Sequence, residues 1–321
     1  MTDSSLSIVA RGLQFPEGPI AMPDASVLVV EIRRGTLTRV MPDGAQHVVA
    51  TLGGGPNGAA IGPDGRCYVC NNGGFRFHDI DGRTFPGLIA DDYSGGRIEV
   101  VDLSTGAHQV IYRECDGVPL RGPNDLVFDA DGGFWFTDHG KTMKRTRDRG
   151  AVFYARPDGT LIRQVVFPLD GPNGIGLSPD GARLYVAESF TGRLWEFEIT
   201  GPGEIRRTKG ALPWERGRLL CALPGYSIPD SLAIDADGNI CVADIPHGGI
   251  SVVSPEGQLL EQIAMPEIFP TNICFGGPDL RTAYVTLSST GCLATMRWPR
   301  PGLPLQWLDR PGPSTSPLLR Q

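Results

Sequence analysis

One short pattern recurs six times along the chain. Each copy has a polar residue that follows proline or threonine, a short apolar run, an aspartate turn and a second apolar run. The polar residue and the turn aspartate are 7 positions apart in every copy. The polar residues are Glu17, Asn57, Asn124, Asn173, Asp230 and Asn272, and the aspartates are Asp24, Asp64, Asp131, Asp180, Asp237 and Asp279. This shared spacing predicts six equivalent β-hairpins.

The distances between copies indicate how much chain each hairpin carries with it. Successive copies begin 40, 67, 49, 57 and 42 residues apart, enough for one four-stranded sheet each with variable insertions. Turns at 41–44, 157–160 and 254–257 predict outer hairpins, with Leu37–Val40 and Ile250–Val253 as third strands. We therefore predict an all-β fold, a six-bladed β-propeller, as a single domain over residues 1–321 with a Pro-rich tail at about 299–321. Ser7–Gln14 is expected to add the outer strand that closes the ring.

Composition agrees with a turn-rich globular fold. The 43 glycines and 28 prolines are 22% of the 321 residues, below the roughly 25–30% typical of low-complexity chains. Hydrophobic residues are 40%, enough for a core. Repeated Asp-Gly turns also fit a two-domain β protein, which stays as an alternative. A doubly wound α/β fold needs helical periodicity between strands, and none is found.

Charge and cysteine content limit the kinds of partner that we expect the protein to bind and the compartment in which we expect it. The net charge of −7 provides no basic surface for nucleic acid, and no apolar run approaches the roughly 18 residues of a membrane span. The N-terminal residues show no export signal. The seven cysteines lack a disulfide or zinc spacing, and Cys67 and Cys70, three apart on a predicted strand, should point to opposite faces. We expect a cytoplasmic protein with reduced thiols, no nucleic-acid or membrane partner, and a monomeric or small homo-oligomeric state.

The six polar residues are the candidate site. The innermost strand of each blade lines the central tunnel of a propeller, so residues that begin these strands converge at one mouth. They are two carboxylates and four amides, without cysteine or histidine. An all-oxygen set suits a hard cation, Ca²⁺ before Mg²⁺, and does not suit zinc. Asn and Asp are also common at turns and strand ends, but six in register favour a site at the mouth.

A second polar row ends the returning strands, at Glu31, Asn71, Asp138, Glu188 and Asp244. It either orients the amides of the first row or consists of ordinary solvated strand ends. His139 and His247 follow closely, and His139 is a catalytic candidate because histidine titrates near neutrality. The basic run 141–149 is either a solvated insertion or a lid that attracts an anionic lactone. Trp135 is expected in the core.

Several of these blocks resemble one known family. FPEGP, GPNDLVFDADGGFWFTD, PNGIGLSPDGARLYVAES, IPDSLAIDADGNICVAD and PTNICFGGPD are similar to the bacterial gluconolactonase branch of the regucalcin, gluconolactonase and luciferin-regenerating enzyme family, over residues 13–297. The resemblance implies a six-bladed propeller with one divalent metal, usually calcium, at the channel mouth. It also implies hydrolysis of sugar lactones, of other cyclic esters and sometimes of organophosphates.

Family roles transfer onto four positions. The resemblance implies Glu17, Asn124, Asn173 and Asp230 as metal ligands, with Asn124 binding metal or substrate in different members. One departure is Ser231, where the family motif has glycine. Because serine does not relieve a positive φ as glycine does, the local backbone is expected to differ.

We therefore expect a metal-dependent hydrolase that opens a sugar lactone such as an aldonolactone. The cofactor is expected to be Ca²⁺, with Mn²⁺, Mg²⁺ or Zn²⁺ as alternatives. Asp230 is the candidate base or nucleophile and His139 a second catalytic candidate; the substrate-binding candidates are Asn57, Asn124 and Asn272. The sequence contains no Gly-x-Ser-x-Gly elbow, the motif typical of serine esterases. The competing classes are a non-enzymatic NHL-like binding propeller and a metal-free strictosidine-synthase-like propeller.

Overall fold

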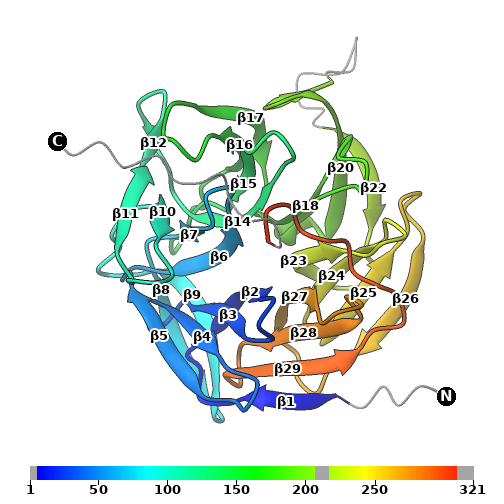
Figure 1. Ribbon diagram of the computed structural model, residues 1–321. Coiled ribbons are helices and arrows are strands. Elements are labelled where there is room, and N and C mark those ends of the chain that lie inside the picture. The colour runs from blue at the N-terminus through cyan, green and yellow to red at the C-terminus, as the bar shows by residue number, and fades with distance from the viewer. Residues whose placement is uncertain (1–5, 207–216, 309–321) are drawn as a thin grey trace.

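The structure, a computed structural model, describes residues 6–206 and 217–308. Within these ranges six antiparallel sheets stand around a central axis, which confirms the predicted propeller (Figure 1). Blade 1 consists of β2 (Pro16–Ala21), β3 (Val27–Glu31), β4 (Thr36–Val40) and β5 (Gln46–Thr51). Blade 2 consists of β6 (Pro56–Ile61), β7 (Cys67–Asn71), β10 (Arg97–Val101) and β11 (His108–Tyr112). Blade 3 consists of β14 (Pro123–Phe128), β15 (Phe134–Asp138), β16 (Gly150–Ala155) and β17 (Ile162–Leu169).

Blades 4 to 6 repeat the same order. Blade 4 consists of β18 (Pro172–Leu177), β19 (Arg183–Glu188) and β20 (Arg193–Gly201), with β21 (Glu204–Ile205) and β22 (Arg218–Ala222) both paired to β20. Blade 5 consists of β23 (Ile228–Ile234), β24 (Ile240–Ile245), β25 (Gly249–Val253) and β26 (Leu259–Ala264). Blade 6 consists of β27 (Pro270–Gly276), β28 (Thr282–Leu287), β29 (Cys292–Arg297) and β1 (Ser7–Ala10). Two short hairpins are inserted, β8 (Phe75–Ile80) with β9 (Arg83–Ile89) and β12 (Glu114–Cys115) with β13 (Val118–Pro119). The one described helix is a 3₁₀ turn, η1 (Ser189–Thr191), so no described helix is long and apolar enough to cross a membrane.

The N-terminal strand closes the ring, as the sequence predicted. β1 pairs with β29, where Ser7 lies opposite Thr295 and Ile8 opposite Ala294. The paired strand ends at Ala10 rather than Gln14. The first and last strands of the described chain thereby share blade 6, and their pairing closes the ring.

The repeated aspartates make the tight turns between first and second strands. Asp24, Asp64, Asp180 and Asp279 each accept a hydrogen bond from the backbone N–H two residues later. In blades 3 and 5 the aspartate two positions earlier, Asp129 or Asp235, accepts these bonds instead. Such Asx turns explain why the pattern recurs at a constant spacing.

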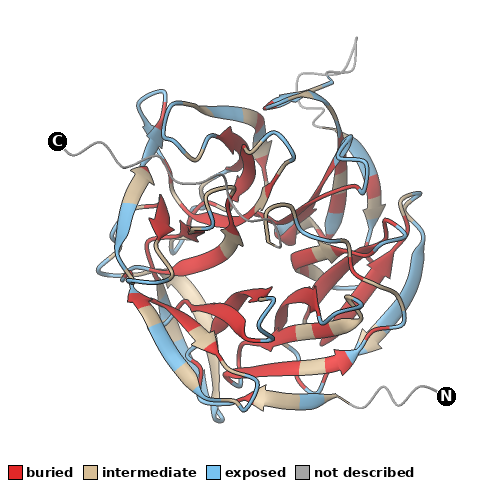
Figure 2. Ribbon diagram, viewed as in Figure 1, coloured by how far each residue is buried: buried red, intermediate tan, exposed pale blue. Residues whose placement is uncertain are grey.

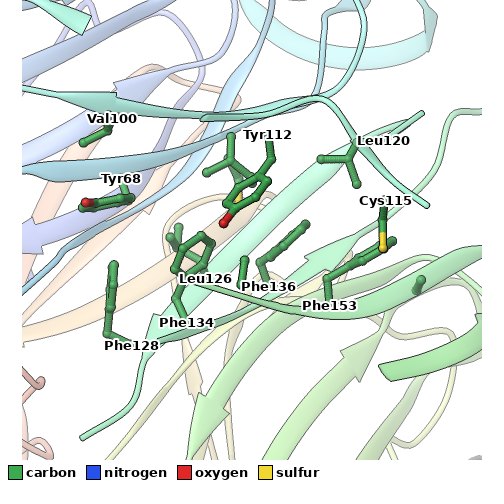
Figure 3. Close-up of a cluster of buried hydrophobic side chains, with 14 residues drawn as sticks. Tyr68, Val100, Tyr112, Cys115, Leu120, Leu126, Phe128, Phe134, Phe136 and Phe153 are labelled. Carbon is green, nitrogen blue, oxygen red and sulfur yellow. The ribbon is translucent and has the colours of Figure 1, made fainter. Parts of the chain in front are cut away.

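Buried residues gather on the inner strands of the blades (Figure 2). Apolar side chains of neighbouring blades pack together in the core clusters. The cluster between blades 2 and 3 contains Tyr68, Phe128 and Phe134, whose rings meet at 5.1–5.8 Å between centroids (Figure 3). Cys67 packs in the cluster on the other side of its sheet and Cys70 in this one. Their opposite orientation is therefore confirmed, and Trp135 is buried in the core as expected.

After β29 the chain crosses the face that bears the hairpin turns (Figure 1). The Leu303 N–H donates to the Ile234 carbonyl, and Trp307 Nε1 donates to the Asp129 carbonyl at 2.9 Å. A cavity of about 380 Å³ lies in the tunnel between this crossing segment and the inner strands, with Asp125 and Asn272 at its inner end. The rest of the predicted Pro-rich tail, 309–321, lies outside the described residues.

Candidate functional site

The six polar residues begin β2, β6, β14, β18, β23 and β27, and these strands neighbour one another around the tunnel (Figure 1). Direct contacts link several of them. Asn272 Nδ2 donates to Glu17 Oε2 at 2.8 Å, and Asn57 Nδ2 donates to the Asn124 carbonyl at 3.3 Å. All are buried except Asp230, which is half-buried. The structure therefore brings the predicted ring together.

Strand pairing is irregular at the start of every inner strand. The pairing register of each inner strand with its neighbour shifts next to the ring residue, for example between Glu17 and Ile20 and between Pro270 and Asn272. A bulge inserts an unpaired residue and turns side chains away from the regular pleat. This shared irregularity is what presents six side chains at one mouth.

Close approach of the inner strands explains the glycines that follow ring residues. A Cβ on Gly58 would lie 2.5 Å from the Asn124 carbonyl oxygen, and one on Gly174 would lie 2.7 Å from Ser231 Cα. Ser231 does not have a positive φ, so the departure from the family glycine causes no backbone strain. The expected difference in backbone from relatives with glycine at this position stays a prediction. The Ser231 hydroxyl donates to Asn173 Oδ1 at 3.4 Å.

Three acidic side chains meet in the tunnel. Burial, strengthened by the Asp230 charge, raises the pKa of Glu17 well above its usual range. Burial raises the pKa of Asp230 to about 7, with Asp125 adding to the effect. Burial likewise raises the pKa of Asp125 to about 7. Like charges out of water disfavour ionisation of one another, so this mouth favours a bound cation or proton.

Asp125 is a site residue that the sequence analysis missed. It follows Asn124 at the position that glycine occupies after Glu17, Asn57 and Asn173. Its carboxylate accepts a hydrogen bond from the Leu126 N–H at 2.9 Å. An aspartate that replaces glycine in an aligned repeat was the available signal.

The donor chemistry fits a hard divalent cation. Asn124 Oδ1 is buried and has no hydrogen-bond partner among the described residues. A carbonyl oxygen can only accept, so it calls for a donor or a cation. No three described His, Cys, Asp or Glu side chains are placed to hold a metal by themselves. A cation bound here would therefore need amide oxygens among its ligands, and a mixed carboxylate and amide set suits Ca²⁺ rather than zinc.

The second polar row anchors loops that lead into the inner strands. Glu31, Asn71 and Asp138 accept hydrogen bonds from the N–H groups of Gln14, Gly55 and Gly122, which lie just before inner strands. Glu188 accepts from the Asp170 N–H and Asp244 from the Ser227 hydroxyl. All five are buried, so the interpretation as solvated strand ends is wrong. Orientation of the ring amides by this row stays a prediction.

His139 lies at the edge of the mouth, beside the start of β18. Its ring is 5.0 Å from that of Phe190, over which Arg147 lies at 3.7 Å. Burial, with Lys141 and Arg147 nearby, lowers the pKa of His139 to about 4. Its Nδ1 is buried without a partner among the described residues. At neutral pH the imidazole is uncharged and able to accept a proton.

The basic run 141–149 is neither a uniformly solvated insertion nor a lid of free charges. Lys144, Arg145 and Arg149 are exposed, but Lys141 is completely buried. A different segment borders the mouth over blade 1. The β8–β9 hairpin packs Phe77 on Phe15 and Phe85 on Phe269, and the Thr84 N–H donates to the Ser289 carbonyl.

The raised carboxyl pKa values predict an unusual pH dependence of stability. Between about pH 4 and 7 the folded protein holds protons on Asp125 and Asp230 that the unfolded chain releases, so unfolding becomes easier as pH rises through this window. We expect the Tm of the metal-free protein to fall by several degrees from pH 5 to pH 8, measured by differential scanning calorimetry. The slope should be smaller in Asp230→Asn. An unchanged slope would show that Asp230 ionises normally.

The chain is similar to known proteins over most of its length. A family model described as SMP-30/Gluconolactonase/LRE-like region matches residues 15–289. The lactonase drp35 of Staphylococcus haemolyticus is 30% identical over 264 residues, covering 81% of this chain and 72% of the relative. The gluconolactonase of Zymomonas mobilis is 26% identical over 313 residues, covering 88% and 79%. A solved gluconolactonase from Xanthomonas campestris shares the fold with a TM-score of 0.73 at 22% identity, covering 93% of this chain and 91% of that one.

Proposed function

This chain belongs to the SMP-30/gluconolactonase/LRE-like family, and we propose that it is a metal-dependent hydrolase that opens a lactone ring. The observation that carries the proposal is the group of buried carboxylates at the tunnel mouth, beside an amide oxygen that lacks a partner among the described residues. Relatives named as lactonase and gluconolactonase supply the reaction class. An aldonolactone is the proposed substrate.

We assign the cation to Glu17, Asn124, Asn173 and Asp230. Glu17 is held in place because Asn272 Nδ2 and the Gly18 N–H both donate to its Oε2. Asn272 is in turn oriented by the Ile273 N–H, which donates to its Oδ1 at 2.8 Å. The oxygen and one N–H of the Asn272 amide are thus engaged, and its second N–H supports the proposed role of Asn272 in substrate binding. A divalent cation bound there would supply Lewis-acid polarisation of the lactone carbonyl.

Asp230 is the proposed base or nucleophile. It is less buried than the other ring residues, so a substrate can reach its carboxylate. Burial raises the pKa of Asp230 to about 7 in the metal-free protein, and a cation beside it would favour the ionised carboxylate. As a carboxylate, Asp230 can accept a proton from water as the water attacks the ester carbon. Alternatively, the carboxylate attacks the carbonyl itself and the acyl group is then hydrolysed.

His139 is proposed as a second catalytic residue that binds the substrate as a neutral imidazole. Its lowered pKa keeps the ring neutral at pH 7, and its buried Nδ1, which has no partner among the described residues, can accept a hydrogen bond. Phe190 and Arg147 would form the wall beside it. The substrate-binding role of Asn57 and Asn124 rests on their place in the ring.

The competing binding-propeller class expects a mouth sealed by apolar or Arg-rich contacts. The ring of this protein instead buries carboxylates that no cationic side chain neutralises among the described residues, an arrangement that costs stability unless a ligand compensates it. Other cyclic esters and organophosphates remain alternative substrates on the same residues.

Direct assay tests the proposal. Purified protein is given a panel of aldonolactones, aromatic lactones and a phosphotriester in a pH-stat, with Ca²⁺, Mn²⁺, Mg²⁺, Zn²⁺ or EDTA. We expect turnover of at least one aldonolactone with Ca²⁺ and none with EDTA. No turnover of any lactone, with no metal found by elemental analysis, would refute the proposed function.

A further inference from the structure

Lys141 is a buried lysine that the proposed chemistry does not use. Its side chain is 0% exposed. The ammonium Nζ donates to Asn72 Oδ1 and to the Gly74 carbonyl, both at 2.9 Å, and lies 3.8 Å from the centre of the Phe75 ring. None of the described acidic side chains forms an ion pair with it. A cation is seldom kept out of water for packing alone, because its desolvation is costly.

Asn72 carries the effect of Lys141 toward the mouth. Its Oδ1 also accepts from the Gly74 N–H at 2.8 Å, and its Nδ2 donates to Asn57 Oδ1 at 3.0 Å. The amide is confined, because a Cβ on Gly55 would lie only 2.4 Å from Asn72 Oδ1. Position 55 must therefore be glycine for Asn72 to occupy this place.

Hydrogen-bond polarity propagates along this chain of groups. A backbone N–H can only donate, and the Gly74 N–H and Lys141 Nζ meet the same Asn72 atom, so that atom is the oxygen and the Asn72 NH₂ faces Asn57. The oxygen of Asn57 is thereby engaged, and its NH₂ group points away from Asn72. One N–H of Asn57 bonds to the Asn124 carbonyl, which leaves the second N–H for a ligand.

We propose that Lys141 and Asn72 are positioning residues that fix Asn57 as a hydrogen-bond donor, not a metal ligand, to an oxygen of the substrate in the tunnel mouth. This inference rests on the proposed function for the identity of the ligand. We call Lys141, Asn72 and Asn57 the amide relay. These three residues link the loop after β15 to the ring residue of blade 2. The relay assigns Asn57 to the substrate and leaves Glu17, Asn124, Asn173 and Asp230 to the cation.

The sharpest test replaces Asn72, the middle residue of the amide relay, so that it can no longer donate a hydrogen bond to Asn57. In Asn72→Asp the shape is kept and Lys141 gains an ion pair, but the carboxylate cannot donate to Asn57. The Asn57 amide must then rotate or lose a partner. We expect kcat/KM for the best lactone to fall by about ten-fold or more, as for one lost hydrogen bond to substrate, while the Tm and the Ca²⁺ affinity from calorimetric titration stay near those of wild type.

Asn57→Asp tests the end of the relay. It keeps the acceptor for Asn72 but removes both N–H donors. We expect a similar fall in kcat/KM without weaker Ca²⁺ binding. Weaker Ca²⁺ binding in Asn57→Leu, which removes the oxygen as well, or clearly tighter Ca²⁺ binding in Asn57→Asp would make Asn57 a metal ligand and overturn the proposal.

Lys141→Met, with Lys144→Met as its matched exposed control, tests the start of the relay. We expect a smaller fall in kcat/KM in Lys141→Met, because the Gly74 N–H still orients Asn72, and no fall in Lys144→Met. If Asn72→Asp does not fold, Lys141→Met and Asn57→Asp decide the question. Wild-type kcat/KM in a folded Asn72→Asp would overturn the proposal while the lactonase function stands.

A readout without turnover separates the relay from the proposed function. In ¹⁵N-labelled protein the side-chain amide signals of Asn57 are assigned by their loss in Asn57→Asp. They should shift in Asn72→Asp and Lys141→Met and stay unchanged in Lys144→Met. If wild type hydrolyses no lactone, the function fails and these spectra alone decide the relay; unmoved Asn57 signals in Asn72→Asp would refute it.

Discussion

Replacing Asp230 by asparagine should lower kcat for lactone hydrolysis by roughly 10²–10⁴-fold, the range contributed by a positioned acid or base. Asparagine keeps the size of the side chain and its contact with Asn173, but it can neither take a proton from water nor attack a carbonyl. The fold should survive, because the substitution removes a buried negative charge that raises the pKa of Glu17. The measurement is steady-state kinetics at saturating Ca²⁺.

The matched control is Asp237→Asn, an exposed aspartate in the turn of the same blade. It should retain the wild-type rate. Full activity in Asp230→Asn would contradict the assignment of Asp230 and move the chemistry toward His139, whose substitution by alanine would then be the decisive variant.

Removing the cation should abolish turnover and change stability in a pH-dependent way. Burial raises the pKa of Glu17 and of Asp230; the Asp230 charge adds to the effect on Glu17, and the Asp125 charge adds to the effect on Asp230. A divalent cation should therefore stabilise the fold most above pH 7, where protons no longer neutralise these carboxylates. We expect EDTA to lower the Tm at pH 8 far more than at pH 5, and Ca²⁺ to restore both the Tm and the rate.

Glu17→Gln should weaken Ca²⁺ binding by more than about 100-fold, because removal of one partner from a buried set of charges costs roughly 3–5 kcal/mol. The metal-free variant should nevertheless be at least as stable as wild type at pH 8, since one buried charge is gone. Glu114→Gln, at an exposed position on β12, is the control. Equal Ca²⁺ affinity in Glu17→Gln and wild type would place the metal elsewhere.

The amide relay and the cation site make different demands on the same mouth. In the proposed site, the carboxylates and the Asn124 oxygen would face the cation, whereas Asn57 presents N–H groups, because its oxygen accepts a hydrogen bond from Asn72. We therefore propose that the ring of six equivalent positions is divided by function, although its members look alike in sequence.

Local chemistry made the ring predictable. The turn aspartates accept backbone N–H groups two residues later, and these bonds depend only on neighbours in the chain. A constant spacing from such a turn to the ring residue therefore reports a constant hairpin geometry. For the same reason the closing strand β1 and the opposite orientations of Cys67 and Cys70 follow from pattern alone.

Contacts between blades were not predictable in this way. Lys141 and Asn72 are 69 residues apart in sequence, and nothing near Lys141 in the basic run 141–149 distinguishes it from its exposed neighbours. Asp138 was expected among ring-orienting or solvated groups, but it binds the loop that enters its own blade. Such partners are chosen by which side chains face each other after the blades assemble.

The sequence by itself determined the six-fold repeat, the all-β fold and the residues at the tunnel mouth, because turns and strand alternation are properties of short segments. Only the tertiary structure decided what those residues face. It placed Asp125 beside Asp230, buried Lys141 against Asn72 and engaged the oxygen of Asn57. Burial and hydrogen-bond direction are set by segments that are distant in the chain, so the division of the ring between cation and substrate emerges only after the propeller closes.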